Sequence, residues 1–70
     1  MSNKYGNKIG INLKKFRKQK NYSLEKVSKL SGLSLNTVVK IESNINKNPT
    51  IETLNKIAKA LEIGVDKLIK

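Results

Sequence analysis

The chain has 70 residues and a formal net charge of +10 at pH 7, from 15 lysines and arginines against 5 aspartates and glutamates. Its length permits one domain, and its charge indicates a polyanionic partner (DNA, RNA or an acidic membrane surface), unless the lysines only form a solvated surface. The sequence has no cysteine and no histidine, which excludes a disulfide framework, the usual zinc and haem sites and the commonest general base, so we expect no metal, no cofactor and no enzymatic activity.

The beginning of the chain is polar, and we expect residues 1–7 to form a short mobile arm. This arm lacks the apolar run of a signal peptide. No other apolar run in the sequence approaches the length needed to span a bilayer. A cytoplasmic protein that does not enter the membrane is therefore the expectation.

A first helix is predicted from about residue 7 or 8 to residue 20. Ile9, Leu13 and Phe16 recur at i, i+4 and i+7, which gives this helix one apolar face. Lysines cover most of the remaining surface of the helix. Gly10 lies in its first turns, where it weakens the helix and leaves room for close packing.

Residues 23–42 organise the chain, because they have the pattern of two short helices joined by one tight turn. Ser23 and Ser34 are good N-caps, and Gly32 suits the left-handed position that ends the first of the two helices. Helices separated by a few residues around a glycine cross steeply, as in a helix-turn-helix. The residues expected to face inward are Val27, Leu33, Val38 and Ile41, with the small Ser28 allowing close approach.

Residues in this segment, and others in register around it, carry a resemblance to a known family. They are Val27, Ser28, Gly32, Leu33, Ser34, Thr37, Val38, Lys40, Ile41 and Glu42, with Arg17, Pro49, Leu54, Ile57, Ala58, Ala60 and Leu61 outside the segment. Over about residues 9–69 the sequence is similar to the Cro/cI phage-repressor family, also called the XRE type. The resemblance implies an all-α fold, a compact five-helix lambda-repressor-like DNA-binding domain over residues 8–70, with its helix-turn-helix at about residues 23–42.

The last third of the chain continues this pattern. A polar loop at residues 43–48 leads to a helix that has Thr50 as its N-cap and the clearest apolar stripe in the sequence. Gly64 is an acceptable N-cap for a last short helix. The family usually has glycine at the positions of Asn44 and Glu62, and of these two residues asparagine is the better suited to a positive φ.

The resemblance also implies an ion pair between Arg17 in the first helix and Glu42 at the end of the second motif helix. Such a pair would tie the two helices together by a forked, charge-assisted contact, which a lysine could not form. The alternative is that both residues are solvated surface charges.

DNA contacts are implied for the second motif helix, which in the family enters the major groove with its N-terminal residues at base edges. Asn36 suits adenine, and Lys40 suits guanine or a phosphate, although both residues would look the same on any solvated helix. Leu35 stands where many relatives have a polar reader, and it can make only apolar contact. The complete set of expected DNA-binding residues is Ser23, Ser34, Leu35, Asn36, Thr37, Lys40, Asn44, Asn46 and Lys47.

Three functional hypotheses follow from the sequence. The favoured one is a sequence-specific, double-stranded DNA-binding transcriptional regulator, a repressor or control protein that binds a pseudo-palindromic operator as a homodimer. The first alternative is an antitoxin that binds a toxin protein, through Ile45 or the C-terminal end, and autoregulates its operon. The second is a protein that binds RNA or anionic membrane through its charge. The candidates for a dimer surface are Ile63, Val65, Leu68 and Ile69.

Overall fold

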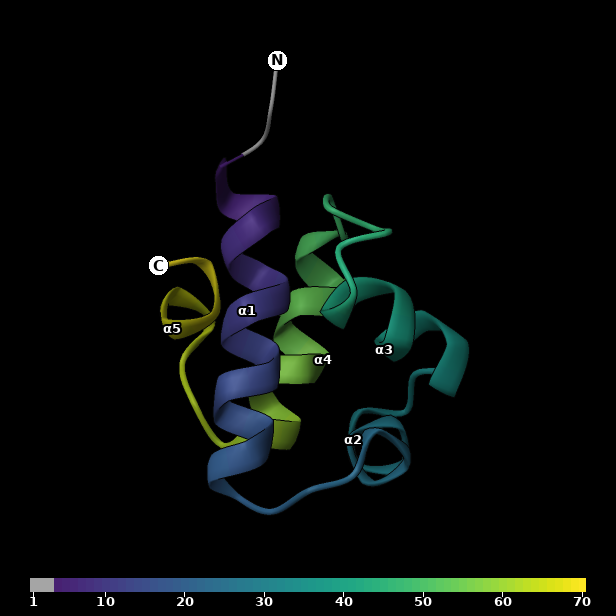
Figure 1. Cartoon of the computed structure of the whole chain (residues 1–70). Coiled ribbons are helices and arrows are strands. Elements are labelled where there is room, and N and C mark those ends of the chain that lie inside the picture. The colour runs from purple at the N-terminus through teal and green to yellow at the C-terminus, as the bar shows by residue number, and fades with distance from the viewer. Residues whose placement is uncertain (1–3) are drawn as a thin grey trace.

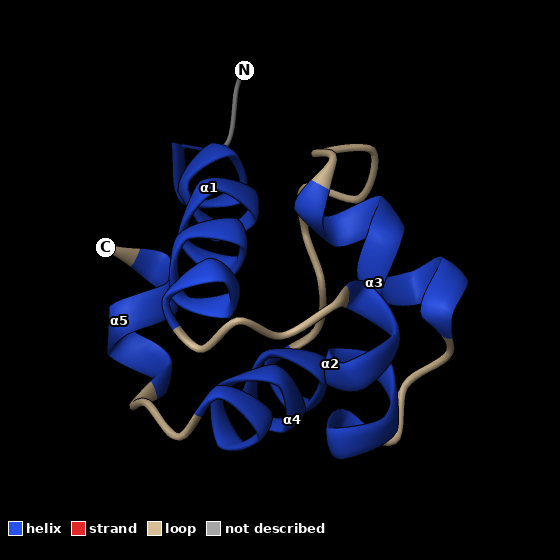
Figure 2. Ribbon diagram, turned by 60° about the horizontal axis from the view of Figure 1, so that its bottom comes forward, coloured by secondary structure: helices blue, strands red, loops and turns tan. Residues whose placement is uncertain are grey.

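The computed structural model describes residues 4–70, with side chains from Lys8 onward. Over this range the chain forms helices joined by loops, and no strand is present (Figure 2). The helices are α1 (Lys4–Gln19), α2 (Leu24–Ser31), α3 (Leu35–Glu42), α4 (Ile51–Leu61) and α5 (Val65–Ile69). The predicted all-α fold of five helices is therefore confirmed.

The start of α1 differs from the sequence-based prediction. The helix begins at Lys4, whereas the apolar stripe predicted a start at residue 7 or 8. A glycine such as Gly6 costs only about 1 kcal/mol inside a helix. Once the later turns of a helix are formed and packed, adding further residues is much easier than nucleating the first turn. Of the expected arm, residues 1–3 lie outside the described residues.

Local capping explains where the middle helices begin and end. The hydroxyl oxygens of Ser23, Ser34 and Thr50 accept hydrogen bonds from backbone N–H groups in the first turns of α2, α3 and α4. Gly32 follows α2 with φ of 77°, which costs a glycine no steric strain. Asn44 and Glu62 have φ of 66° and 59°, so both residues adopt the left-handed conformation that their places in the family pattern require.

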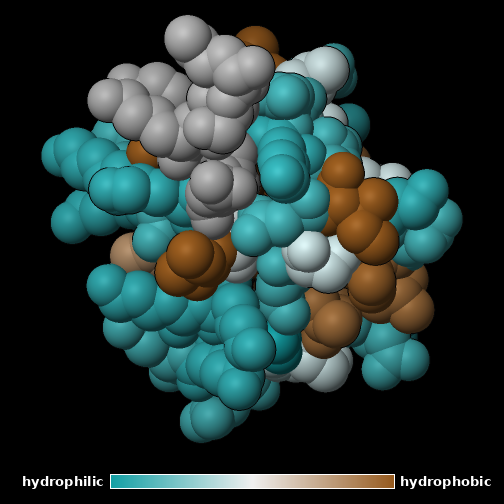
Figure 3. Space-filling model, turned by 45° about the horizontal axis from the view of Figure 1, so that its top comes forward, coloured by the Kyte–Doolittle hydropathy of each residue, from teal (hydrophilic) through white to brown (hydrophobic). Residues whose placement is uncertain are grey.

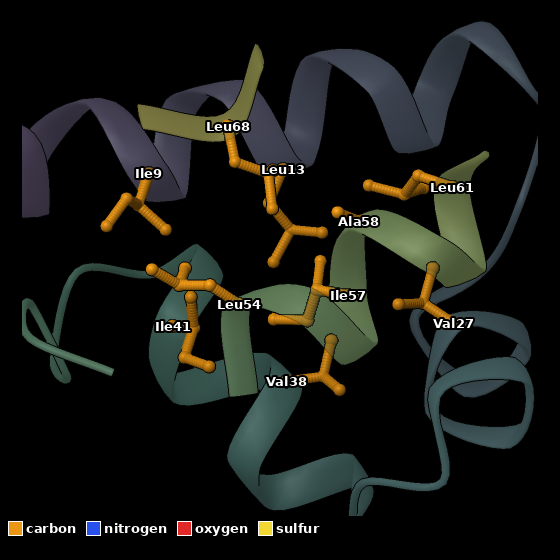
Figure 4. Packing of buried hydrophobic residues seen from close by; sticks show 10 residues of the cluster. All are labelled: Ile9, Leu13, Val27, Val38, Ile41, Leu54, Ile57, Ala58, Leu61 and Leu68. Atoms are coloured by element: carbon orange, nitrogen blue, oxygen red, sulfur yellow. The ribbon is translucent and has the colours of Figure 1, made fainter. Parts of the chain in front are cut away.

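The core is formed by apolar side chains from all five helices. α1 runs through the middle of the molecule, with α5 on one side and α3 and α4 on the other (Figure 1). The largest fully buried side chains come from α1 (Leu13), α2 (Val27), α3 (Val38, Ile41), α4 (Ile57, Leu61) and α5 (Leu68), and they converge between the helices (Figure 4).

One proposed dimer-surface residue is excluded by this packing. Leu68 has no solvent exposure, because it packs into the core of its own chain. The other three candidates, Ile63, Val65 and Ile69, are partly buried against the same core. An apolar side chain at this end of the chain can pack into the core of its own chain or contact a partner. The hydrophobic pattern alone does not distinguish these two possibilities.

Arg17 joins α1 to the end of α3 and to the loop before α2. Its Nε donates to Oε1 of Glu42 at 2.7 Å, and its Nη2 donates to Oε2 of the same carboxylate at 3.0 Å. Its Nη1 donates to the carbonyl oxygen of Tyr22 at 2.8 Å. Both charged side chains are only 13% exposed. The predicted forked contact is therefore present, and it fixes α3 relative to α1.

We predict that Arg17→Ala destabilises the fold by about 3 kcal/mol, because it leaves the shielded Glu42 carboxylate and the Tyr22 carbonyl unpaired. Lys18→Ala is the matched control, since it removes an exposed cation from the same helix. Thermal or urea unfolding of both variants measures the difference. Equal losses of stability would show that the ion pair does not hold the helices together.

α1 and α3 lie close together at Gly10. A Cβ atom at this position would lie 2.8 Å from the carbonyl oxygen of Ile41, 2.9 Å from that of Glu42 and 2.6 Å from Oδ1 of Asn44. Two of these atoms belong to the backbone at the end of α3, so they cannot move unless the helix moves. Gly10 thus permits the close packing of the two helices.

Gly10→Ala should therefore destabilise the fold by about 1–3 kcal/mol through overpacking, although alanine is the better helix former by about 1 kcal/mol. Lys14→Ala is the control for an alanine at an exposed position of the same helix, where it meets no neighbouring helix. Urea unfolding gives both values. A Gly10→Ala variant as stable as the parent would contradict the close approach described above.

Candidate nucleic-acid interface

α3 has one buried face and one exposed face. Val38 and Ile41 are fully buried in the core. The residues that α3 exposes to solvent are Leu35, Asn36, Val39 and Lys40. Three of the expected DNA-binding residues, Leu35, Asn36 and Lys40, therefore lie on the accessible part of the helix. Thr37 is half-buried at its edge.

The start of α3 is held by its own cap. The Ser34 hydroxyl oxygen accepts a hydrogen bond from the Thr37 backbone N–H at 3.1 Å, and the two hydroxyl groups are 2.8 Å apart. The Thr37 hydroxyl therefore has a partner within the helix. The geometry favours a structural role for Ser34 and Thr37, which orient the first turn of α3 and the residues that it exposes.

The turn between α2 and α3 is fixed by side-chain hydrogen bonds that the sequence pattern did not reveal. The Ser28 hydroxyl donates to the Leu33 carbonyl oxygen at 2.6 Å, so this residue does more than allow close approach. Ser31 is buried, its hydroxyl donates to the Ser28 carbonyl oxygen, and it accepts from the Leu33 N–H. A serine near a helix C-terminus is too common for sequence alone to identify this role.

Ser23 caps the N-terminal end of α2 by accepting a hydrogen bond from the Lys26 N–H at 3.0 Å. Lys26 and Lys29 are exposed on the same helix. Ser23 is itself exposed. It and the lysines therefore form an accessible polar edge on the first helix of the helix-turn-helix.

The loop after α3 contains three residues that were expected to contact DNA, and they differ in exposure and in hydrogen bonding. Lys47 is exposed. Asn46 donates its backbone N–H to the Lys40 carbonyl oxygen at 2.9 Å, and its Oδ1 accepts from the Asn48 N–H at 3.1 Å. Asn44 is half-buried, and its Oδ1 is buried without a hydrogen-bond partner among the described residues. That oxygen faces the close approach at Gly10. The structure thus brings Lys47 to the surface and turns the Asn44 oxygen inward.

Apolar side chains are also exposed on this side of the molecule. Hydrophobic surface gathers where Figure 1 places α3 and the loop after it (Figure 3). The exposed large apolar residues of α3, this loop and the start of α4 are Leu35, Val39, Ile45 and Ile51. Ile45 is 72% exposed, so its side chain is accessible in the loop after α3.

The described part of the chain contains neither a cluster of metal-ligating side chains nor a membrane-spanning helix. No group of three or more acidic, histidine or cysteine side chains is arranged there to hold a metal ion. None of the helices described combines the length and the apolar character that crossing a membrane requires.

Comparison with known proteins shows to which family the chain belongs. The family model described as Helix-turn-helix matches residues 13–68. The HTH-type transcriptional regulator SinR of Bacillus subtilis (strain 168) is 34% identical over 61 residues, which make up 87% of this chain and 55% of that protein. The HTH-type transcriptional regulator SlrR of the same organism is 33% identical over 60 residues, or 86% of this chain and 40% of that protein.

A solved structure agrees with these sequence matches. It is the N-terminal DNA binding domain of SinR from Bacillus subtilis, which matches with a TM-score of 0.85 and 34% identity over 89% of this chain and 90% of that chain. This chain spans about half the length of the curated relatives that it matches. The sequence pattern, the five-helix fold and these matches agree, and the chain belongs to the helix-turn-helix family of the Cro/cI, or XRE, type.

Proposed function

We propose that this chain is a sequence-specific, double-stranded DNA-binding transcriptional regulator that places α3 in the major groove. One observation carries the proposal: α3 is anchored by the fully buried Val38 and Ile41 and leaves Asn36 and Lys40 exposed. Amide and ammonium groups on such a helix suit the base edges of the groove. The net charge of +10 suits the phosphate backbone. Membership of the helix-turn-helix family also supports the proposed function.

The operator expected for this protein is pseudo-palindromic, and the protein is expected to bind it as a homodimer in the cytoplasm. A single α3 contacts too few base pairs to select a site, so two copies related by a two-fold axis would read two half-sites. Selection of bound sequences from a random duplex pool tests this directly. Enrichment of an inverted repeat supports the proposal, and a pool without any enriched sequence would refute sequence-specific binding.

A second candidate function is an antitoxin that binds a protein partner in addition to DNA. The observation that favours it is the strongly exposed Ile45, which no intramolecular packing of the fold requires. Co-expression with the product of the neighbouring gene separates the two functions. Stable co-purification that is lost in Ile45→Asp would favour the antitoxin, and the DNA selection would show whether both activities coexist.

We predict that Asn36→Ala relaxes the base preference at one position in each half-site and costs about 1–3 kcal/mol of binding free energy there. The reason is that the variant loses an amide that can pair with a base edge. Competition between the selected duplex and random DNA measures the change. An unchanged ratio of specific to random affinity would show that Asn36 does not contact a base.

Lys47→Ala should have the opposite signature, because its exposed ammonium group is proposed to contact a phosphate. Binding to all sequences should weaken nearly equally, and the slope of log affinity against log salt should decrease by about one unit for each subunit engaged. Titrations at several salt concentrations measure the slope, with Asn36→Ala as the matched comparison. A slope identical to that of the parent would remove Lys47 from the interface.

Dimer formation is predicted on the operator, with the two half-sites centred about 34–36 Å apart along the duplex. Of the C-terminal surface, Ile63, Val65 and Ile69 remain partly accessible for this contact. Equilibrium ultracentrifugation of the free protein and of its complex with the selected duplex measures the stoichiometry. Only monomers in both samples would rule out the dimer.

A further inference from the structure

α3 exposes two large apolar side chains beside its polar ones. Leu35 is 41% exposed and Val39 is 36% exposed. They are four residues apart, so they occupy neighbouring turns on the same side of the helix. The apolar residues that anchor α3 are Val38 and Ile41 instead, and both are fully buried. The core of the protein therefore does not account for the accessible apolar surface of Leu35 and Val39.

Exposed polar residues of α3 adjoin this apolar pair. Asn36 follows Leu35 and Lys40 follows Val39, and both of these polar residues are exposed. An apolar partner protein would have to desolvate the neighbouring amide and ammonium groups, which is costly without specific partners. A ligand that combines negative charge with small apolar groups fits this surface better. In the major groove, the apolar group that a base presents is the C5-methyl group of thymine.

We propose that Leu35 and Val39 determine specificity by packing against thymine methyl groups, so that each half-site carries two thymines at defined positions. This inference rests on the proposed function. One helical turn spans about 5.4 Å and successive base pairs are about 3.4 Å apart, so the two thymines should be one or two base steps from each other. RNA lacks this methyl group, and the pair therefore also favours DNA over RNA.

The test replaces single thymines of the selected duplex by deoxyuridine, which removes only the methyl group and keeps every hydrogen-bonding group of the base. Burial of one methyl group corresponds to about a fourfold change in affinity. We expect a loss of about that size at two thymines of each half-site and no loss at the others. A second duplex carries cytosine in place of one of these thymines, and a third carries 5-methylcytosine at the same position. The methyl group of 5-methylcytosine should restore part of the affinity that is lost with cytosine.

Protein variants identify the side chains involved. Leu35→Ala should bind the thymine duplex more weakly and should lose the sensitivity to deoxyuridine at one of the two positions, and Val39→Ala should lose it at the other. Leu30→Ala is the matched control, because Leu30 is a leucine of α2 with 47% exposure. It should retain both sensitivities. The deoxyuridine measurement on the unmodified protein requires no variant, so it decides the proposal even if a variant folds poorly.

The outcomes separate this inference from the proposed function. If an inverted repeat is selected and bound with strong salt dependence, but no thymine is sensitive to deoxyuridine, the thymine assignment is overturned and the DNA-binding function stands. Sensitivity that persists in both Leu35→Ala and Val39→Ala also overturns it. If no sequence is enriched at all, the proposed function fails, and this inference fails with it.

Discussion

The position of α3 depends on its attachment to α1 at two neighbouring points. Arg17 holds the Glu42 carboxylate with two nitrogen atoms and the Tyr22 carbonyl with the third, so one guanidinium fixes the end of α3 and the loop before α2. At Gly10, the absence of a side chain lets the final carbonyls of α3 rest against α1. Because the buried face of α3 is fixed in this way, its exposed face has a defined orientation toward a ligand.

Much of this arrangement follows from local sequence signals. Ser23, Gly32 and Ser34 specify the two helix starts and the turn between them through capping chemistry, which acts within a few residues and is therefore legible in the sequence. The inward positions of Val38 and Ile41 follow from helical periodicity in the same way. The Arg17–Glu42 contact joins residues that are distant in the chain, and it was implied only by the resemblance to a known family.

Other features depend on tertiary packing and could not be read from the sequence. Leu68 has the same apolar character as its neighbours in α5, and only the packed structure shows that it is completely buried in the core of its own chain. Asn44 is one of the residues expected to contact DNA, and only the packed structure shows that its side-chain oxygen is buried next to Gly10. Ser31 supports the turn through hydrogen bonds that arise only once α2 and α3 have met.

The surface proposed to meet DNA consists of the exposed face of α3 and the loop after it. The most direct measurement is a titration of isotope-labelled protein with its selected duplex, followed by NMR chemical shifts of each backbone amide. We predict that the largest changes fall on α3, on residues 43–48 and on the start of α2, with smaller changes around Ile63, Val65 and Ile69, where the two copies are proposed to meet. Changes concentrated on α5 and the lysine-covered side of α1, with α3 unaffected, would contradict it.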